Sequence, residues 1–341
     1  MDHAQETILI TGGAGYIGSH TVRLLAGQRR KIVVLDNLVF GHEQAILDPD
    51  VELVVGDVGD QELVRSLFAK HQFGAVIHFA AYAYVGESVT NPLKYYQNNT
   101  AEPIKLLQVM QEYGCKVFVF SSTCATYGVP DKLPITETNQ QKPINPYGMS
   151  KLMVEHILAD CGIAWGLRSA CLRYFNASGC SMDGLIGEDH DPETHLIPRV
   201  MMAVTGEIEH IEVFGTDYDT PDGTCIRDYI HVEDLADAHA RALDHLAAGG
   251  ASVRCNLGTG VGVSVKEIIS AVEEITGKSV PVKYGPRREG DPASLVADPA
   301  LAEELLGWVA SRKDIRDMVR PAWTWISGSR GGRYPENVKS S

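Results

Sequence analysis

The first half of the chain alternates short apolar runs with segments of helical pattern. The apolar runs, which are candidate strands, lie at 8–11, 31–36, 51–56, 75–79, 116–121 and 169–174. The candidate helices between them lie at 18–26, 61–71, 93–113 and 147–161. Parallel strands that are buried on both faces read as continuous apolar runs, and their crossovers are usually helices. The pattern therefore predicts an α/β fold with a doubly wound parallel sheet.

The pattern changes after Asn176. Residues 177–195 are rich in Gly, Asp, Glu and Ser, which predicts a long loop, and turn-rich stretches recur at 215–224 and 284–292 among apolar helices and short strands. These features predict a smaller mixed α/β domain beside the first. The expected parts are a first domain at 1–176 with a returning segment near 228–250, a second domain at 177–330, and a loosely ordered tail at 331–341.

A glycine-rich segment, Thr11–Gly18, connects the first apolar run to the first candidate helix. Its glycines Gly12, Gly15 and Gly18 allow the backbone to approach a pyrophosphate, and the helix N-terminus favours the negative charge. The second apolar run ends in Asp36, whose carboxylate can bind the adenosine ribose hydroxyls and would repel a 2′-phosphate. We therefore expect a Rossmann-type domain that binds NAD in preference to NADP.

Tyr147 and Lys151 are four residues apart in a candidate helix, with Asn145 placed to cap it, so both side chains share one helix face. A phenol has a reference pKa of about 10, so a tyrosine base that works near pH 7 needs about 4 kcal/mol of phenolate stabilisation. Lys151 and the helix N-terminus act in that direction. Thr123, at the end of an earlier strand, can donate to a substrate oxygen and relay its proton to Tyr147.

The glycine-rich segment, the strand-end hydroxyl and the Tyr/Lys pair, in this order, resemble the extended short-chain dehydrogenase/reductase superfamily. Over residues 7–326 the chain resembles the UDP-glucose 4-epimerases in particular. The motifs that carry this resemblance lie at 11–20, 35–38, 78–81, 85–88, 95–99, 173–176, 227–234, 256–258 and 287–291.

This resemblance implies an enzyme that keeps NAD through turnover and interconverts UDP-glucose and UDP-galactose. Tyr147 would take the proton of the sugar 4-OH while the C4 hydride passes to NAD⁺, and the 4-keto sugar would then rotate and receive hydride on its other face. The helices at 93–113 and 147–161 would pair two subunits into a homodimer.

The resemblance also assigns roles to individual residues. The catalytic residues would be Tyr147, Lys151 and Thr123. The cofactor would contact Gly12, Gly15, Tyr16, Ile17, Gly18, Asp36, Asn37, Asp57, Val58, Phe79, Ala80, Ala81, Asn98, Ser121, Tyr147, Lys151 and Tyr174. The UDP-sugar would contact Thr123, Asn176, His195, Leu196, Phe214, Arg227, Tyr229, Arg288, Asp291 and Leu295.

The chain departs from the family pattern at Thr123, where Ser is commoner, and at Ala83, where many relatives carry Lys. Leu295 occupies a gatekeeper position at an intermediate size, and residues 83–88, 121–128 and 223–230 are closer to UDP-arabinose 4-epimerases. UDP-xylose/UDP-arabinose and UDP-N-acetylglucosamine therefore remain alternative substrates.

A sugar-nucleotide dehydratase is less favoured because no Asp-Glu pair follows Thr123. A non-enzymatic NAD-binding protein is less favoured because the Tyr/Lys pair is intact.

The net charge of −14 argues against nucleic acid as a partner, because such proteins need a basic face. No apolar run approaches the length of a membrane span, and the chain begins without the basic segment of a signal peptide. The seven cysteines include no C-x-x-C pair, and the His/Cys spacing suggests no zinc site. We therefore expect a cytoplasmic protein with no metal and no membrane contact.

Overall fold

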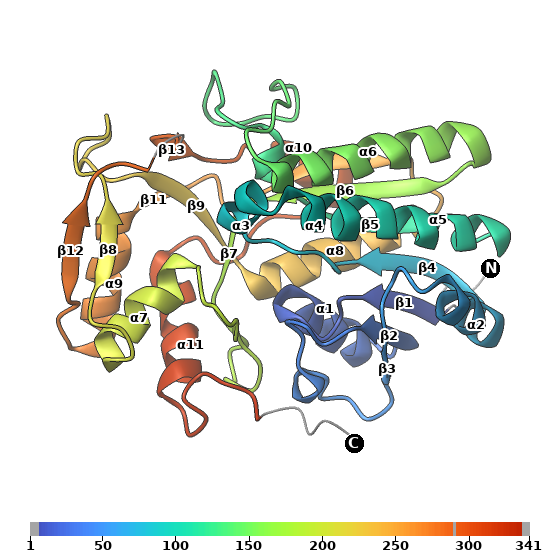
Figure 1. The fold of residues 1–341 in the computed structure, drawn as a ribbon, viewed down its shortest axis with the longest axis horizontal. Coiled ribbons are helices and arrows are strands. Elements are labelled where there is room, and N and C mark those ends of the chain that lie inside the picture. Colours follow the sequence, from blue (N-terminus) through green and yellow to red (C-terminus); the bar gives the residue numbers. More distant parts are fainter. Residues whose placement is uncertain (1–6, 289–290, 336–341) are drawn as a thin grey trace.

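The computed structural model describes residues 7–288 and 291–335. A parallel sheet of seven strands, in the order β10-β6-β5-β4-β1-β2-β3, forms its largest element (Figure 1). The strands are β1 (Thr7–Thr11), β2 (Ile32–Asp36), β3 (Glu52–Val55), β4 (Phe73–His78), β5 (Val117–Thr123), β6 (Arg168–Tyr174) and β10 (Val253–Leu257). Successive strands are added on one side of β1 as far as β3, and on the other side from β4 onward. The strand order therefore reverses between β1 and β4, which is where ligands bind in such folds. The predicted doubly wound parallel sheet is thus confirmed.

Helices cover both faces of this sheet and bury its apolar side chains. On one face lie α1 (Tyr16–Gly27), α8 (Val232–Ala247) and α10 (Ala300–Leu306), which share one apolar core with the strands. On the other face lie α2 (Gln61–His71), α5 (Glu102–Glu112) and α6 (Pro146–Trp165), with a second core. In Figure 1 the axes of α5 and α6 run nearly parallel in this view, and both helices contact the π-helical turn at 97–101. The two cores hold the carboxyl ends of the strands in fixed positions.

The prediction of a single helix over 93–113 is wrong in detail. The structure has α3 (Val85–Thr90), α4 (Pro92–Tyr96), a π-helical turn (Gln97–Ala101) and only then α5. Pro103 has no N–H to donate to the residue four positions earlier, so the α-helical hydrogen-bond pattern cannot run unbroken through this point. The Asn99 side chain hydrogen-bonds to both the N–H and the carbonyl oxygen of Tyr82 at 2.9 Å, which ties the turn to the segment after β4.

Smaller sheets stand beside the carboxyl ends of the large one. Strand β9 (Ile226–His231) pairs with β7 (Asn176–Ser178), β11 (Gly262–Ser264) and β13 (Ser294–Leu295), and β8 (Ile211–Phe214) pairs with β12 (Val282–Gly285). Helices α7 (Leu196–Thr205), α9 (Val265–Thr276) and α11 (Ile315–Ser327) share their core. After β9 the chain returns to the large sheet, because α8 packs against α1 and β10 pairs with β6.

The end of the described chain is packed against the loop that follows β7. Tyr334, which lies in the segment predicted to be loosely ordered, is buried; its hydroxyl accepts a hydrogen bond from the Gly187 N–H at 3.0 Å, and its own N–H donates to Asp189 at 2.8 Å. The rest of that predicted tail, 336–341, lies outside the described residues. Within the described part of the chain, no helix combines the length and apolarity needed to cross a bilayer.

Candidate active site

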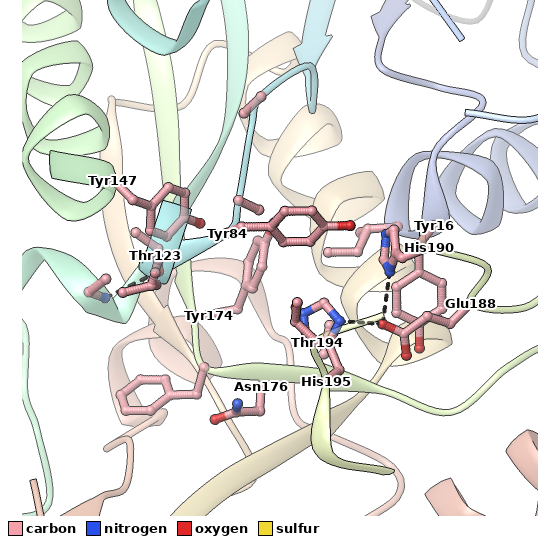
Figure 2. A pocket seen from close by; sticks show the side chains of 18 of the residues that line it. Tyr16, Tyr84, Thr123, Tyr147, Tyr174, Asn176, Glu188, His190, Thr194 and His195 are labelled. Carbon is pink, nitrogen blue, oxygen red and sulfur yellow. Dashed lines mark hydrogen bonds and ion pairs between the residues drawn. The ribbon is translucent and has the colours of Figure 1, made fainter. Parts of the chain in front are cut away.

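All the candidate site residues named above line one cavity of about 1140 Å³ between the large sheet and the smaller ones. The cavity opens at the carboxyl ends of β1, β2, β4, β5 and β6, which bring together residues far apart in the sequence. Figure 2 shows part of it, with Thr123 and Tyr147 on one side and Glu188, His190 and His195 on the other. This shared location supports the grouping of these residues. Their individual roles stay predictions.

The glycine-rich segment forms a turn that leaves room for a ligand. Gly12 has a φ of +70°, and a Cβ atom there would lie 2.5 Å from the Ala80 nitrogen, while a Cβ on Gly18 would overlap the Gly12 carbonyl oxygen. Helix α1 begins at Tyr16 with no side-chain cap and no acidic residue in its first turn, so its N-terminus keeps its attraction for an anion. The segment therefore has the shape and polarity that a pyrophosphate requires.

Asp36 ends β2 beside this turn. Its two carboxylate oxygens accept hydrogen bonds from the Ala14 and Leu38 N–H groups, each at 2.9 Å. Burial raises the pKa of Asp36, and the two backbone hydrogen bonds act in the opposite direction. Each oxygen retains a lone pair, so the carboxylate can still accept two ribose hydroxyls. The geometry fits the adenosine half of a dinucleotide.

Tyr147 and Lys151 lie one helix turn apart at the start of α6. Asn145 caps this helix as predicted, with its side chain accepting the Gly148 N–H at 2.8 Å. Lys151 is buried, and its Nζ donates to the Ser121 carbonyl oxygen at 2.8 Å. Burial lowers the pKa of Lys151 to about 7. The lysine is therefore held by the end of β5, an anchor that the sequence did not predict.

Burial dominates the acid–base properties of Tyr147. It raises the pKa of the phenol above its usual range, the nearby Tyr174 adds to this effect, and a hydrogen bond with Thr123 opposes it. Thr123 Oγ1 also accepts the Ala125 N–H at 3.1 Å. A phenolate in this environment needs compensating positive charge. Lys151 on the same helix face provides this charge when it is protonated, and a phenolate beside it would favour its protonated form.

The other end of the cavity carries Arg227 and Arg288, two arginines that the resemblance assigns to UDP-sugar binding, in different environments. Arg227 pairs with Asp291 at 3.0 Å and donates to the Pro292 carbonyl oxygen at 2.9 Å. The Arg288 guanidinium lies 3.9 Å from the centre of the Phe214 ring, and no ion pair of Arg288 is found among the described residues. Arg288 therefore offers an anion a less neutralised charge than Arg227 does.

Several lining residues were not identified from the sequence. They include Phe40, Tyr84, Cys124, Glu188, His190 and Arg199. Glu188 and His190 belong to a loop in which Glu and His recur at short spacing, Glu188-Asp-His190-Asp-Pro-Glu193-Thr-His195, and this recurrence was the available signal. Burial opposes a charged His195, but Glu188 and Glu193 outweigh it and raise the pKa of His195 to about 10.

The fold and this cavity define a Rossmann-type enzyme of the dinucleotide-dependent class. The family model described as "NAD dependent epimerase/dehydratase family" matches residues 8–258, and the chain belongs to this family.

Named relatives are similar over nearly the whole chain. A UDP-glucose 4-epimerase of Rhizobium leguminosarum bv. trifolii is 50% identical over 326 residues, which cover 96% of this chain and 99% of the relative. The UDP-glucose 4-epimerase of Halalkalibacterium halodurans is 49% identical over 330 residues, which cover 97% of this chain and 98% of the relative. The chain in the crystal structure of UDP-glucose 4-epimerase from Brucella ovis in complex with NAD is 53% identical in sequence. It superposes with a TM-score of 0.90, covering 93% of this chain and 97% of that chain.

Proposed function

We propose that this chain is a UDP-sugar 4-epimerase that interconverts UDP-glucose and UDP-galactose with bound NAD. One observation carries this proposal. A single cavity contains the glycine-rich turn, the Tyr147/Lys151/Thr123 group and the two arginines. The names of the relatives agree with it, because UDP-glucose 4-epimerases about half identical to the chain cover nearly its full length.

The residues present fit NAD. Gly12 and Gly18 leave space where a side chain would collide with backbone, and Asp36 can accept ribose hydroxyls at the end of β2. When bound, the nicotinamide would supply the acceptor and donor for the hydride of the sugar C4. The adenosine end would contact Asn37, Asp57 and Val58, which line the same side of the cavity.

The proton chemistry is assigned to Tyr147. Its phenolate would take the proton of the sugar 4-OH and return it when the opposite configuration forms. Thr123 would hold the same oxygen, since its hydroxyl both donates and accepts. Lys151 would supply the positive charge that burial of Tyr147 makes necessary, from its anchor on the Ser121 carbonyl oxygen.

UDP binding is assigned to the smaller sheets. Arg288 and Arg227 would bind the diphosphate, and an arginine guanidinium suits phosphate oxygens because it donates two parallel hydrogen bonds. Phe214 and Tyr229 would line the nucleotide pocket. Asp291 would hold the uridine ribose, and its ion pair with Arg227 places it beside the diphosphate ligand.

The chain divides, in this proposal, into an NAD-binding part at 1–176 with the returning segment near 228–250, and a UDP-sugar part at 177–330. The packing of α8 on α1 supports the return. The structure also shows β9 (226–231) pairing with the smaller sheets, so the return is supported from α8 onward.

We further propose a cytoplasmic homodimer. Helices α4, α5 and α6 lie near one another on one side of the molecule (Figure 1) and expose apolar side chains that two copies could cover. Leu93 on α4 is 77% exposed and Ile163 on α6 is 87% exposed, and Ile104 and Met153 add to this surface. The mass of the purified protein in solution, measured by light scattering, tests the dimer.

The proposed activity is tested by incubating the NAD-containing protein with UDP-galactose and resolving the nucleotide sugars by chromatography and mass spectrometry. A UDP-glucose product of unchanged mass is expected. A product that has lost one water would indicate a dehydratase instead, and no conversion of any UDP-sugar would overturn the proposal. UDP-xylose, UDP-arabinose and UDP-N-acetylglucosamine in the same assay define the substrate range.

A further inference from the structure

Four potential metal ligands converge in the loop between β7 and α7. The side chains of Glu188, His190, Glu193 and His195 each offer one ligand atom, and these four atoms all lie within 4.8 Å of one another. Figure 2 shows the two imidazole rings turned toward the carboxylate of Glu188. Of these four residues, only His195 has a role in the family resemblance, as a UDP-sugar contact.

The distances between the ligand atoms suit a small divalent cation. His195 Nδ1 lies 2.6 Å from Glu188 Oε1 and 3.2 Å from Glu193 Oε1, and His190 Nδ1 lies 3.2 Å from Glu188 Oε1 and 3.7 Å from Glu193 Oε2. Zinc bound tetrahedrally at about 2.0–2.1 Å leaves about 3.3 Å between neighbouring ligand atoms. The two distances of 3.2 Å match this value, the distance of 3.7 Å is measured to the second oxygen of Glu193, and the shortest distance, 2.6 Å, needs a side-chain adjustment.

Burial gives a second, independent reason to expect a ligand. The Glu188 side chain is only 7% exposed, and its Oε1 and the Nδ1 of His190 are buried without a well-directed hydrogen bond, although each lies within ion-pair distance. Buried polar groups normally have partners with good geometry. A cation at the centre of the four ligands would satisfy both atoms at once.

The loop is held in place from outside the cluster. The Trp325 indole donates to the Glu188 carbonyl oxygen at 3.0 Å, and the neighbouring Asp189 accepts the Tyr334 N–H at 2.8 Å. The four ligands therefore do not have to be gathered from a disordered segment, which lowers the entropic cost of binding.

Although the His/Cys spacing of the sequence led us to expect no metal, we propose that Glu188, His190, Glu193 and His195 form a binding site for a divalent cation of the zinc class. Two imidazoles with two carboxylates favour zinc or a similar transition metal over magnesium or calcium, which prefer oxygen ligands alone. Binding displaces the Nδ1 protons of the two histidines into solvent. The bound cation fixes the loop that leads into Leu196 and α7, and so positions His195 at the cavity wall.

The competing interpretation is a cluster of ion pairs in which protons alone bridge the imidazoles and carboxylates. A titration with Co²⁺ separates the two interpretations, because tetrahedrally bound cobalt absorbs visible light far more strongly than hydrated, octahedral cobalt. The untagged, NAD-containing protein is dialysed against a chelator, freed of it, and titrated with Co²⁺ and with Zn²⁺ at mildly alkaline pH. We expect one saturable equivalent per chain, displacement of Co²⁺ by Zn²⁺, and a higher Tm with the metal bound.

His190→Asn and Glu193→Gln each remove one ligand and are expected to weaken Co²⁺ binding by at least about tenfold. The matched controls are His210→Asn and Glu209→Gln, which alter a surface His/Glu pair 3.9 Å apart and should bind Co²⁺ as the parent chain does. Retained NAD and a cooperative melting curve establish that each variant is folded.

Failure of the parent chain to bind one saturable equivalent overturns the proposal, and so does unchanged affinity in His190→Asn. If either variant fails to fold, the test of that variant is replaced by anomalous diffraction at the zinc edge from crystals of the parent chain. An ion found anywhere but between these four side chains counts against the proposed site. None of these measurements uses turnover, so their failure is distinct from failure of the proposed activity.

Discussion

Replacement of Gly12 by alanine tests whether the glycine-rich turn has the geometry that binds a pyrophosphate. The backbone at Gly12 has a φ of +70°, and an alanine Cβ would lie 2.5 Å from the Ala80 nitrogen and 2.8 Å from its Cα. This neighbour cannot easily yield, because the N–H groups of Phe79 and Ala80 both donate to the Thr11 carbonyl oxygen, at 2.8 and 3.1 Å.

The expected loss in the free energy of unfolding has two parts. An alanine in the left-handed region costs about 1–2 kcal/mol, and forcing a methyl group into a packed site adds about 1–3 kcal/mol. We therefore expect Gly12→Ala to lower the free energy of unfolding by at least about 2 kcal/mol, which for a chain of this length corresponds to a fall in Tm of at least roughly 3 °C. The moved turn should also lose its bound NAD.

Gly27→Ala is the matched control in the same helix–turn unit. Gly27 ends α1, is exposed, and an added Cβ there would have no atom within 4 Å. Alanine in a helix is more stable than glycine by about 0.5–1 kcal/mol. The assays are Tm and the NAD released per chain on denaturation. A Gly12→Ala protein with full NAD content and the parent Tm would refute the reasoning.

Two further predictions concern the diphosphate site and the buried histidines. Arg288→Ala should raise KM for UDP-galactose by about tenfold or more, because it removes one charge-assisted contact to the diphosphate. The control Arg287→Ala should leave KM unchanged, since Arg287 lies outside the cavity and pairs with Asp217. Equal KM values in the two variants would contradict the assignment of Arg288. Burial lowers the pKa of His239 to about 4, so the unfolded chain binds the extra proton first and stability falls as pH drops below about 6.5. The urea-measured loss between pH 7.5 and 5 should be smaller in His239→Gln by about 2 kcal/mol, but not in His210→Gln; an unchanged loss in His239→Gln would exclude this contribution.

The large sheet was mostly predictable because its strands are buried on both faces. Strands β1 to β6 appear in the sequence as apolar runs, and the predicted ends differ from the observed ones by only a few residues. Strand β10 was not predicted. It lies at the edge of the sheet, carries the exposed Arg254, and enters after a long excursion through the smaller sheets, so neither its pattern nor its position in the chain indicates its neighbour.

Helix boundaries near the cavity were less predictable. The segment 93–113 has helical periodicity, but the π-helical turn at Gln97–Ala101 depends on the tertiary hydrogen bonds of Asn99 to Tyr82. Such contacts join parts of the chain that the local pattern treats separately. The sequence therefore predicts that a helix exists here more reliably than where it is interrupted.

The candidate site divides in the same way. The glycine-rich turn, Asp36 and the Tyr147/Lys151 pair follow from short-range spacing, so they could be identified from residues alone. The anchor of Lys151 on the Ser121 carbonyl oxygen and the ion pair of Arg227 with Asp291 join residues distant in the sequence, and only the fold reveals them. The sequence does not indicate that Glu188, His190, Glu193 and His195 converge, although they are close in the chain, because the conformation of the loop sets the direction of each side chain.

The central claim is that Tyr147 moves the proton of the sugar 4-OH. The most direct test is kcat for conversion of UDP-galactose by Tyr147→Phe, with NAD content and UDP-galactose binding measured on the same preparation. The account predicts at least about a 10²-fold lower kcat with cofactor and substrate still bound. A kcat within a few-fold of the parent chain, at equal NAD content, would contradict it.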